Sequence, residues 1–193
     1  MVKLGVTGGI GSGKSYVCRI LSEELGIPVY NCDIHARIIT LTDIDVIESL
    51  SRLIECVYDS EGELDKQRLA QYLFTSAEHA AQVNGIIHPA VRRDLHEWLR
   101  HFADSPIVAI ESAILYESGF QDEVDHVLFV DAPQEIRLQR VAHRDALSPD
   151  EVLRRMQSQR PDEASRRADY RILNDGTADL HAQLKQIISR LTK

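Results

Sequence analysis

The chain has 193 residues, of which 44% are hydrophobic, so it is long enough for one α/β domain with an inserted subdomain. Its formal net charge of −8 disfavours non-specific binding to nucleic acid or anionic membranes, and no apolar run approaches the roughly 18 residues of a transmembrane helix. Three scattered cysteines without a C-x-x-C pair indicate neither a disulfide framework nor a zinc site, and without a visible signal peptide we expect a cytoplasmic protein.

The first predicted elements are a short apolar strand at residues 2–7, a glycine-rich turn, and a helix at residues 15–25. The turn runs from Gly8 to Ser15 and fits the phosphate-loop pattern G-x-x-x-x-G-K-[ST] at every fixed position. An ordinary glycine-rich turn is the alternative. The strand before the turn and the helix after it favour the phosphate loop, because that order is the one the chemistry requires.

The loop predicts binding of a nucleoside triphosphate. Its glycines allow the backbone to curl so that N–H groups point at phosphate oxygens, and the helix N-terminus adds partial positive charge. Lys14 can reach the β- and γ-phosphates, and Ser15 can ligate Mg²⁺. The expected fold class is therefore α/β, with a three-layer core of the phosphate-loop (P-loop) NTPase type.

Five apolar, β-branched segments alternate with helical patterns, as in the βαβ units of a parallel sheet. Polar residues end or follow four of these segments, and open parallel sheets place their active sites at the carboxyl ends of strands. The candidate residues are therefore expected at one edge of a five-stranded sheet. The segments are Val2–Thr7, Pro28–Cys32, Ile107–Glu111, His126–Asp131 and Tyr170–Asn174, and the polar residues are Thr7, Asp33, Glu111 and Asp131.

Residues 34–105 are too long for a single crossover helix and carry mostly helical patterns. They predict an inserted helical subdomain that receives a second substrate. A turn is expected at Asp59–Gly62, and Pro89 predicts a kink or break near His88. The helical pieces are Ile34–Ile39, Ile44–Ile54, Lys66–Phe74 and Glu78–Phe102.

Residues 133–171 contain nine arginines against seven acidic residues, although the chain as a whole is acidic. A solvated helical surface with ion pairs accounts for several of them, but the planar arginine fork also suits phosphate. A short arginine-bearing excursion near a phosphate site predicts a closing lid. Its parts are a helix from Pro133 to about His143, a helix start at Ser148–Glu151, and a helical stretch to Ala168. Arg137, Arg140 and Arg144 share one helix face.

Among phosphate-loop proteins, small-molecule kinases fit this organisation. GTPases need a guanine-reading N-K-x-D stretch and a D-x-x-G switch, and neither occurs in the required order. Large motor-type ATPases are too long. Two alternatives stay open, which are a kinase acting on another nucleotide or small metabolite and a non-catalytic ATP-binding regulatory module.

Short motifs follow one another along nearly the whole chain: Val6–Ser15, Asp33–Arg37, Ile87–Pro89, Leu115–Glu117, Arg140, Arg144, Gln159, Ala168–Tyr170 and Asn174–Gly176. In this order they resemble the dephospho-CoA kinase family, whose members catalyse the last step of coenzyme A synthesis. The chain departs from the family pattern in three places. Tyr16 replaces the usual Thr, Asn31 replaces a common Asp, and residues 113–117 replace Pro-Leu-Leu-Phe-Glu.

The resemblance implies that the chain phosphorylates the ribose 3′-hydroxyl of dephospho-CoA, with ATP and Mg²⁺ as cofactors. It implies small-molecule partners only, without nucleic acid or membrane, in a monomer or weak oligomer. Asp33 would accept the proton of the acceptor hydroxyl, and its alternative role is a helix N-cap. The implied division comprises a nucleotide-binding core (residues 1–33, 106–140 and 168–193), a helical acceptor (CoA) subdomain (residues 34–105) and a lid (residues 141–167).

The implied catalytic residues are Asp33, Lys14 and Arg140, of which Arg140 stabilises charge on the transferring phosphate. The implied metal ligand is Ser15. Glu111 and Asp131 can each bind Mg²⁺ through water or simply cap a loop at a strand end. By pattern alone, Asn174 is a turn residue. The residues implied to bind the nucleotide are Gly9, Gly11, Ser12, Gly13, Lys14, Ser15, Tyr16, Arg144 and Asn174.

Overall fold

The computed structural model describes residues 1–146, 148–157 and 161–192. Within these residues the chain forms two compact units. The first unit contains Met1–Asn31 and Phe102–Lys193, and the second contains Cys32–His101. We call them the sheet unit and the helical unit and describe each by itself.

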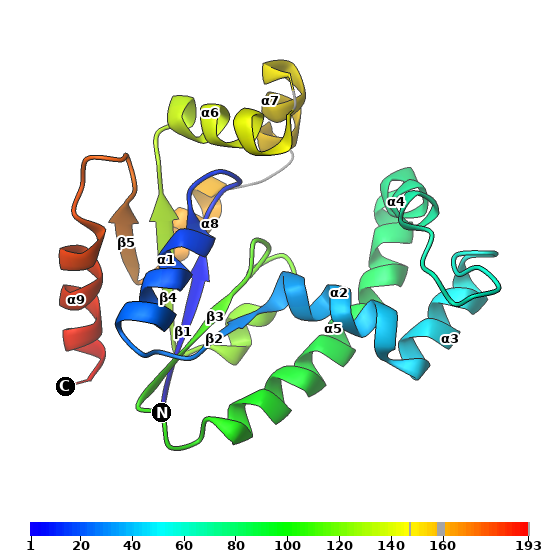
Figure 1. Ribbon diagram of the computed structural model, residues 1–193, viewed down its shortest axis with the longest axis horizontal. Coiled ribbons are helices and arrows are strands. Elements are labelled where there is room, and N and C mark those ends of the chain that lie inside the picture. The colour runs from blue at the N-terminus through cyan, green and yellow to red at the C-terminus, as the bar shows by residue number, and fades with distance from the viewer. Residues whose placement is uncertain (147, 158–160, 193) are drawn as a thin grey trace. The chain divides into compact units, whose positions relative to one another are not determined.

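The sheet unit is built on a five-stranded sheet with the order β2-β3-β1-β4-β5 (Figure 1), in which every pair of neighbours is parallel. The predicted parallel sheet is therefore confirmed. Strand β2 is shorter than the predicted segment because Cys32 already belongs to the following helix. The strands are β1 (Val2–Thr7), β2 (Val29–Asn31), β3 (Ile107–Glu111), β4 (His126–Asp131) and β5 (Tyr170–Leu173).

The register of the sheet brings residues from three strands together at its carboxyl edge. Glu111 at the end of β3 lies opposite Val6 of β1 on one side and opposite Asn31 of β2 on the other. Strand β3 is buried along its whole length. Its apolar residues are excluded from water, while its terminal carboxylate lies where the loop after β1 begins.

Helices pack on both faces of the sheet, as expected for α/β folds. Helix α1 (Lys14–Arg19) continues directly into a wider π-helical turn, Ile20–Glu24, so the predicted helix at residues 15–25 is present with a change of winding. The core between helices and strands contains Leu4, Val17 and Leu184, each fully buried. The other helices of this unit are a 3₁₀ turn (Phe120–Glu123), α6 (Gln134–Asp145), α7 (Pro149–Gln157), α8 (Pro161–Arg167) and α9 (Leu180–Leu191).

The arginine-rich segment is helical, as its sequence predicts. Ser148 and Glu151 form a capping box at the start of α7, in which the Ser148 hydroxyl donates to Glu151 Oε2 at 2.6 Å. These hydrogen bonds lower the pKa of the Glu151 carboxyl. The stretch predicted to run to Ala168 consists of two helices, α7 and α8.

The helical unit contains four helices at the predicted places: α2 (Cys32–Thr42), α3 (Ile44–Leu53), α4 (Lys66–Thr75) and α5 (Ala77–His101). Asp43 and Asp65 cap α3 and α4 by accepting backbone N–H groups. Asp59 accepts two N–H groups in the predicted turn. Helix α5 runs through Pro89 without a break, so the break considered near His88 does not occur.

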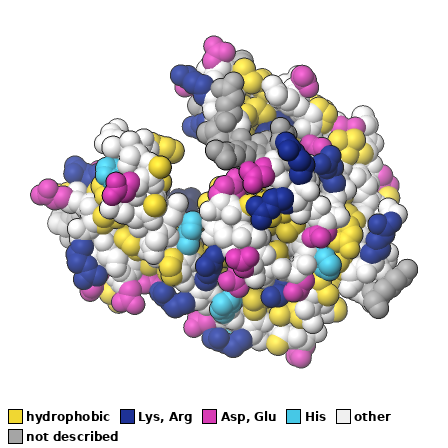
Figure 2. Space-filling model, turned by 180° about the vertical axis from the view of Figure 1, so that it is seen from behind, with side chains coloured by type: hydrophobic (Ala, Val, Ile, Leu, Met, Phe, Trp, Pro, Cys, Tyr) yellow, Lys and Arg dark blue, Asp and Glu magenta, His cyan; other side chains and the backbone are white. Residues whose placement is uncertain are grey.

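None of the described helices is long and apolar enough to cross a membrane. Basic and acidic side chains are interspersed over the face shown in Figure 2. That face therefore shows no broad field of a single charge.

Candidate nucleotide-binding site

The predicted phosphate loop connects the end of β1 with the first turn of α1. Gly13 caps α1 in the left-handed region, with φ 91°, where a side chain is strained. A Cβ atom at Gly13 would also lie 2.2 Å from Asn174 Nδ2. Only glycine therefore fits this position, and the loop backbone is held close to residues from the other end of the sheet unit.

Two side chains of the loop point into its interior. Lys14 is only 9% exposed. Its ammonium group donates to the carbonyl oxygens of Gly8 at 2.7 Å and Gly9 at 3.3 Å. The Ser12 hydroxyl is buried and has no hydrogen-bond partner among the residues that the structure describes. A buried, unmatched hydroxyl is costly, so this group suits a loop that takes up a polar ligand.

Ser15, at the start of α1, is tied to the neighbouring strand. Its hydroxyl donates to Glu111 Oε1 at 3.0 Å, and the side-chain amide of Asn31 donates to Glu111 Oε2 at 2.7 Å. The Glu111 carboxylate is 5% exposed and bridges β2 and the phosphate loop. Cys18 lies nearby, and burial together with the negative charge of Glu111 raises the pKa of its thiol. The thiol therefore stays protonated and unreactive.

Two arginines of α6 reach the phosphate loop. Arg137 Nε donates to the Ile10 carbonyl at 2.9 Å. Arg140 donates to the Ser12 carbonyl at 3.4 Å, and to the carbonyl and side-chain oxygens of Asn174 at 3.1 and 3.3 Å. The loop is thus held by a helix that follows β4, more than 120 residues along the chain.

Asn174 connects the end of β5 to the same loop. Its N–H group donates to the Asp131 carbonyl at 2.8 Å, and its Nδ2 donates to the Ser12 carbonyl at 2.8 Å. The side chain is 6% exposed. A turn role alone does not account for a buried amide that spans from β5 to the phosphate loop.

The side chains of Arg144 and Asp131 contact residues outside the phosphate loop. Arg144 makes two hydrogen bonds with its neighbour Asp145, at 2.7 and 3.1 Å, and is largely exposed. The hydrogen bond from Arg144, together with its positive charge, lowers the pKa of the Asp145 carboxyl. Asp131 lies 3.9 Å from Arg171 at the end of β4. Of the three arginines predicted to share a face, only the first two contact the loop among the described residues.

A pocket of about 440 Å³ opens beside the loop in the sheet unit. Tyr16 forms part of its wall, is 45% exposed, and has the Arg19 guanidinium 5.0 Å from its ring centroid. The pocket combines apolar and polar groups, as small-molecule sites do. It is lined by Gly13, Tyr16, Arg140, Asn174, Gly176, Ala178, Asp179, Leu180 and His181.

The predicted acceptor-side residue, Asp33, belongs to the helical unit. It is the second residue of α2 and lies in its first turn, so it is not the residue preceding the helix as the capping alternative supposed. Its side chain is exposed. Two residues after Asp33 on α2, His35 Nδ1 lies 2.6 Å from Asp94 Oδ2 of α5.

The sequence alone did not predict that Arg137 contacts the phosphate loop or that Glu111 accepts a hydrogen bond from Ser15. The spacing of Arg137 and Arg140 on one face of α6 is the signal that pairs them. No local signal links Glu111 to Ser15, because the two residues meet only through the strand order. Gln159, part of the motif resemblance, lies outside the described residues.

Comparisons with known proteins agree on one family. Residues 2–179 match the family model described as dephospho-CoA kinase. Dephospho-CoA kinase of Bacteroides fragilis is 44% identical over 98% of this chain and 93% of its own length. That of Porphyromonas gingivalis is 43% identical over 97% of this chain and 92% of its own length.

Solved structures agree in fold. A protein from Thermus thermophilus matches with a TM-score of 0.86 and 36% identity, over 100% of this chain and 98% of its own. Shikimate kinase from Acinetobacter baumannii matches with a TM-score of 0.54 and 18% identity, over 99% of this chain and 92% of its own. The second likeness shows only that the fold is shared with another kinase.

Proposed function

The chain belongs to the dephospho-CoA kinase family of ATP-dependent kinases, and on this premise we propose that it transfers the γ-phosphate of ATP to the 3′-hydroxyl of dephospho-CoA. The observation that best supports this proposal is the structure of the phosphate loop. The loop brings together a buried lysine, a buried hydroxyl without a partner among the described residues, and a helix N-terminus.

The loop binds the triphosphate of ATP. Backbone N–H groups of residues 8–15 and the Ser12 hydroxyl donate to phosphate oxygens, and Lys14 neutralises charge on the β- and γ-phosphates. Lys14 now donates to two neutral carbonyl oxygens. A phosphate is a stronger acceptor for an ammonium group, so the nucleotide exchanges one set of hydrogen bonds for a better one.

The residues beside Ser15 fit a magnesium ion. A hydroxyl and a carboxylate 3.0 Å apart are oxygen donors of the kind that Mg²⁺ prefers. Ser15 would hold the ion, and Glu111, fixed by Asn31, would orient the Ser15 hydroxyl toward it. When bound, Mg²⁺ neutralises charge between the β- and γ-phosphates.

Arg140 and Asn174 contact the nucleotide from the pocket beside the loop. Arg140 stabilises negative charge on the transferring phosphate, and Asn174 and Tyr16 border the adenine base in the adjacent pocket. Arg144, in the arginine-rich segment proposed as the lid, adds positive charge when that segment closes. Its present partner is the Asp145 carboxylate.

The helical unit binds dephospho-CoA, and Asp33 positions the acceptor hydroxyl and accepts its proton. The oxygen of that hydroxyl then forms the new bond to phosphorus while the bond to the β-phosphate oxygen breaks, and ADP leaves. The support is the place of Asp33, an exposed carboxylate two residues after a strand that ends at the carboxyl edge of the sheet. Such a carboxylate is open to a substrate and within reach of solvent for releasing the proton.

An assay of ADP release with three acceptors tests the assignment. Dephospho-CoA should support turnover, while a nucleoside monophosphate and shikimate should support at least about a hundredfold less, since a site specific for polar groups rejects acceptors that leave them unpaired. Phosphorus NMR of the product should place the new phosphate on the 3′-oxygen. Preferential turnover of either other acceptor would assign a different kinase, and turnover of none would leave a nucleotide-binding module.

A further inference from the structure

A second pocket, of about 430 Å³, lies wholly within the helical unit. It is formed by α2, by the chain leading to α4, and by the first turns of α4. Three leucines supply apolar surface, one threonine supplies a polar edge, and two cations stand at the pocket. The lining residues are Arg37, Thr40, Leu41, Leu64, Lys66 and Leu69.

The walls of this pocket are fixed by hydrogen bonds. The Thr40 hydroxyl donates to the Ala36 carbonyl at 2.7 Å, and the Tyr58 hydroxyl donates to the Thr40 carbonyl at 2.6 Å. Tyr58 and Leu64 form an antiparallel bridge, and Asp65 caps α4. The pocket is therefore built before any ligand arrives, which reduces the entropy lost on binding.

One face of α2 is apolar and exposed although the helix packs on α5 through its opposite face. Ile34, Ile38 and Leu41 are 57%, 49% and 39% exposed, whereas Ile39 is 7% exposed. Large aliphatic side chains that recur on an exposed helix face mark a surface that receives another molecule. Asp33 and Arg37 alternate with them on the same face.

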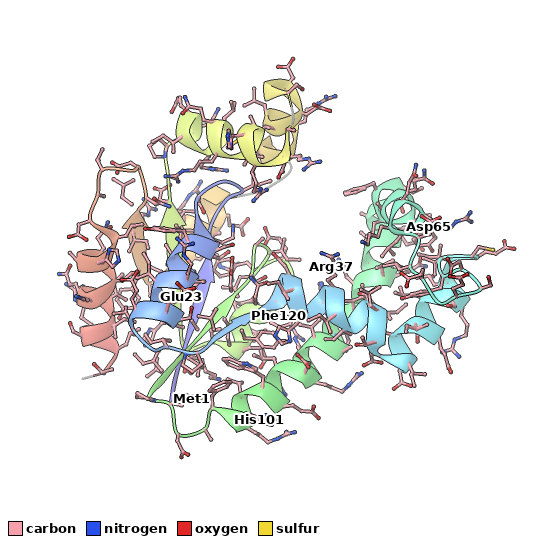
Figure 3. The ribbon with its side chains drawn as sticks, viewed as in Figure 1. Met1, Glu23, Arg37, Asp65, His101 and Phe120 are labelled. Atoms are coloured by element: carbon pink, nitrogen blue, oxygen red, sulfur yellow. The ribbon has the colours of Figure 1, made fainter. Side chains whose placement is uncertain are left out.

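The two cations of the pocket differ from four arginines elsewhere in the unit, which pair with carboxylates. Neither Arg37 nor Lys66 has a carboxylate partner among the described residues. Figure 3 shows the labelled Arg37 projecting from α2 on the side on which α4 and the labelled Asp65 lie. The arginines of this unit that do pair with carboxylates, at 3.5 to 3.9 Å, are Arg52, Arg68, Arg93 and Arg100.

We propose that this pocket binds the pantetheine arm of dephospho-CoA and that Arg37 and Lys66 bind its diphosphate. The inference rests on the proposed function. Asp33, Arg37 and Leu41 are spaced four residues apart, so they follow one another along one side of α2 at steps of about 6 Å. The acceptor presents its groups in the same order, with the 3′-hydroxyl, the diphosphate, and then the branched aliphatic pantoyl group.

The chemistry of each group matches its place. The diphosphate is the anionic part of the molecule and would lie between two cations, and arginine binds phosphate through a planar fork. The pantoyl group carries two methyl groups on one carbon and would lie against Leu41, Leu64 and Leu69. Amide groups of the arm would remain at the polar edge beside Thr40 or in water. Ile34 and Ile38 would cover the sugar and the start of the arm.

Two substitutions in the pocket and two matched substitutions elsewhere in the unit test this inference. Leu41→Gln removes apolar surface, and its control is Ile44→Gln, an exposed isoleucine on α3 outside the pocket. Lys66→Gln removes a cation, and its control is Arg52→Gln, which has a largely exposed side chain. The dissociation constant of dephospho-CoA is measured by titration calorimetry without ATP. The KM for each substrate is measured separately, and thermal unfolding checks that every variant folds.

Leu41→Gln should weaken dephospho-CoA binding on the order of tenfold or more, because a substrate methyl group in an apolar pocket discriminates at that level. Lys66→Gln should weaken it several-fold and reduce its salt dependence. The KM for ATP should stay within twofold, and both controls should bind dephospho-CoA like the wild type. In the wild type, 4′-phosphopantetheine should compete with dephospho-CoA, and it should compete about tenfold less well in Leu41→Gln.

The inference is overturned if both pocket variants bind dephospho-CoA within twofold of their controls, or if 4′-phosphopantetheine does not compete. If Leu41→Gln fails to fold, Lys66→Gln and the competition experiment decide. Failure of the proposed function has a different signature, which is a wild-type protein that transfers no phosphate to dephospho-CoA. Wild-type turnover with unaffected pocket variants rejects only the pocket.

Discussion

Replacing Asn31 by aspartate tests whether Glu111 is a buried anion held by neutral donors. In the wild type, the Asn31 amide donates to Glu111 Oε2 at 2.7 Å and Ser15 donates to Oε1. Asn31→Asp has almost the same shape but converts this donor into a second carboxylate. Because Glu111 is 5% exposed, water screens the new repulsion poorly.

The size of the effect follows from the geometry. Two unit charges about 4 Å apart at an effective dielectric constant of about 20 interact with about 4 kcal/mol. The repulsion should therefore raise the pKa of the introduced carboxyl by about three units, at 1.36 kcal/mol per unit. A raised carboxyl pKa destabilises the folded state above the unfolded value of about 3.9, and the penalty shrinks as the pH falls toward that value. We expect the free energy of unfolding to fall by about 4 kcal/mol at pH 8 and by about 1.5 kcal/mol at pH 5.

Denaturant unfolding of Asn31→Asp and wild type at pH 8 and pH 5 measures both differences. Asn31→Ala is the control, because it removes the same hydrogen bond without adding charge. Its penalty, about 1–3 kcal/mol for a buried acceptor that loses its donor, should change less between the two pH values than that of Asn31→Asp, because no second carboxylate is added. Equal penalties for Asn31→Asp at the two pH values would show that the electrostatic reasoning is wrong.

Three further predictions concern catalysis and binding. Lys14→Ala should fold normally but lose several kcal/mol of transition-state stabilisation, and turnover within about threefold of wild type, or roughly 0.7 kcal/mol, would reject its role. Asp33→Asn should keep its melting temperature and ATP affinity, since the side chain is exposed, while turnover falls on the order of 10²-fold; near-wild-type turnover would remove the base role. In hydrogen exchange, dephospho-CoA should protect residues 34–105 and an ATP analogue mainly residues 8–16. Equal protection of both ranges by the analogue alone would contradict that division.

The sequence predicted the sheet well because its strands are buried apolar runs that end at polar residues. The bounds of β1, β3 and β4 agree with the prediction residue for residue. The end of β2 was harder to predict, since Cys32 is apolar and extends the pattern although its backbone is already helical. Helix α5 was predicted to kink or break because proline removes one hydrogen bond, but the remaining turns keep it continuous.

The candidate site was predictable where its residues are neighbours in the sequence and not where they meet through topology. The loop pattern gives Lys14 and Ser15 directly. The contact between Ser15 and Glu111 joins residues 96 positions apart and exists only because β3 pairs with β1. Asn31 reaches the same carboxylate because β2 pairs with the other edge of β3. Asn31, which stands where the family commonly has Asp, thus donates the hydrogen bond that holds Glu111 in this chain. The sequence alone does not show this contact.

The arginines of α6 show why spacing on a helix face does not by itself identify a phosphate ligand. Arg140 donates to neutral oxygens of Ser12 and Asn174, whereas Arg144 is bound by the Asp145 carboxylate. An incoming phosphate can replace a neutral acceptor with a gain in electrostatic energy, but it must compete with a carboxylate of its own sign. Under the proposed function, Arg140 would therefore bind a phosphate oxygen from its present position. Arg144 can do so only after its ion pair with the neighbouring Asp145 opens.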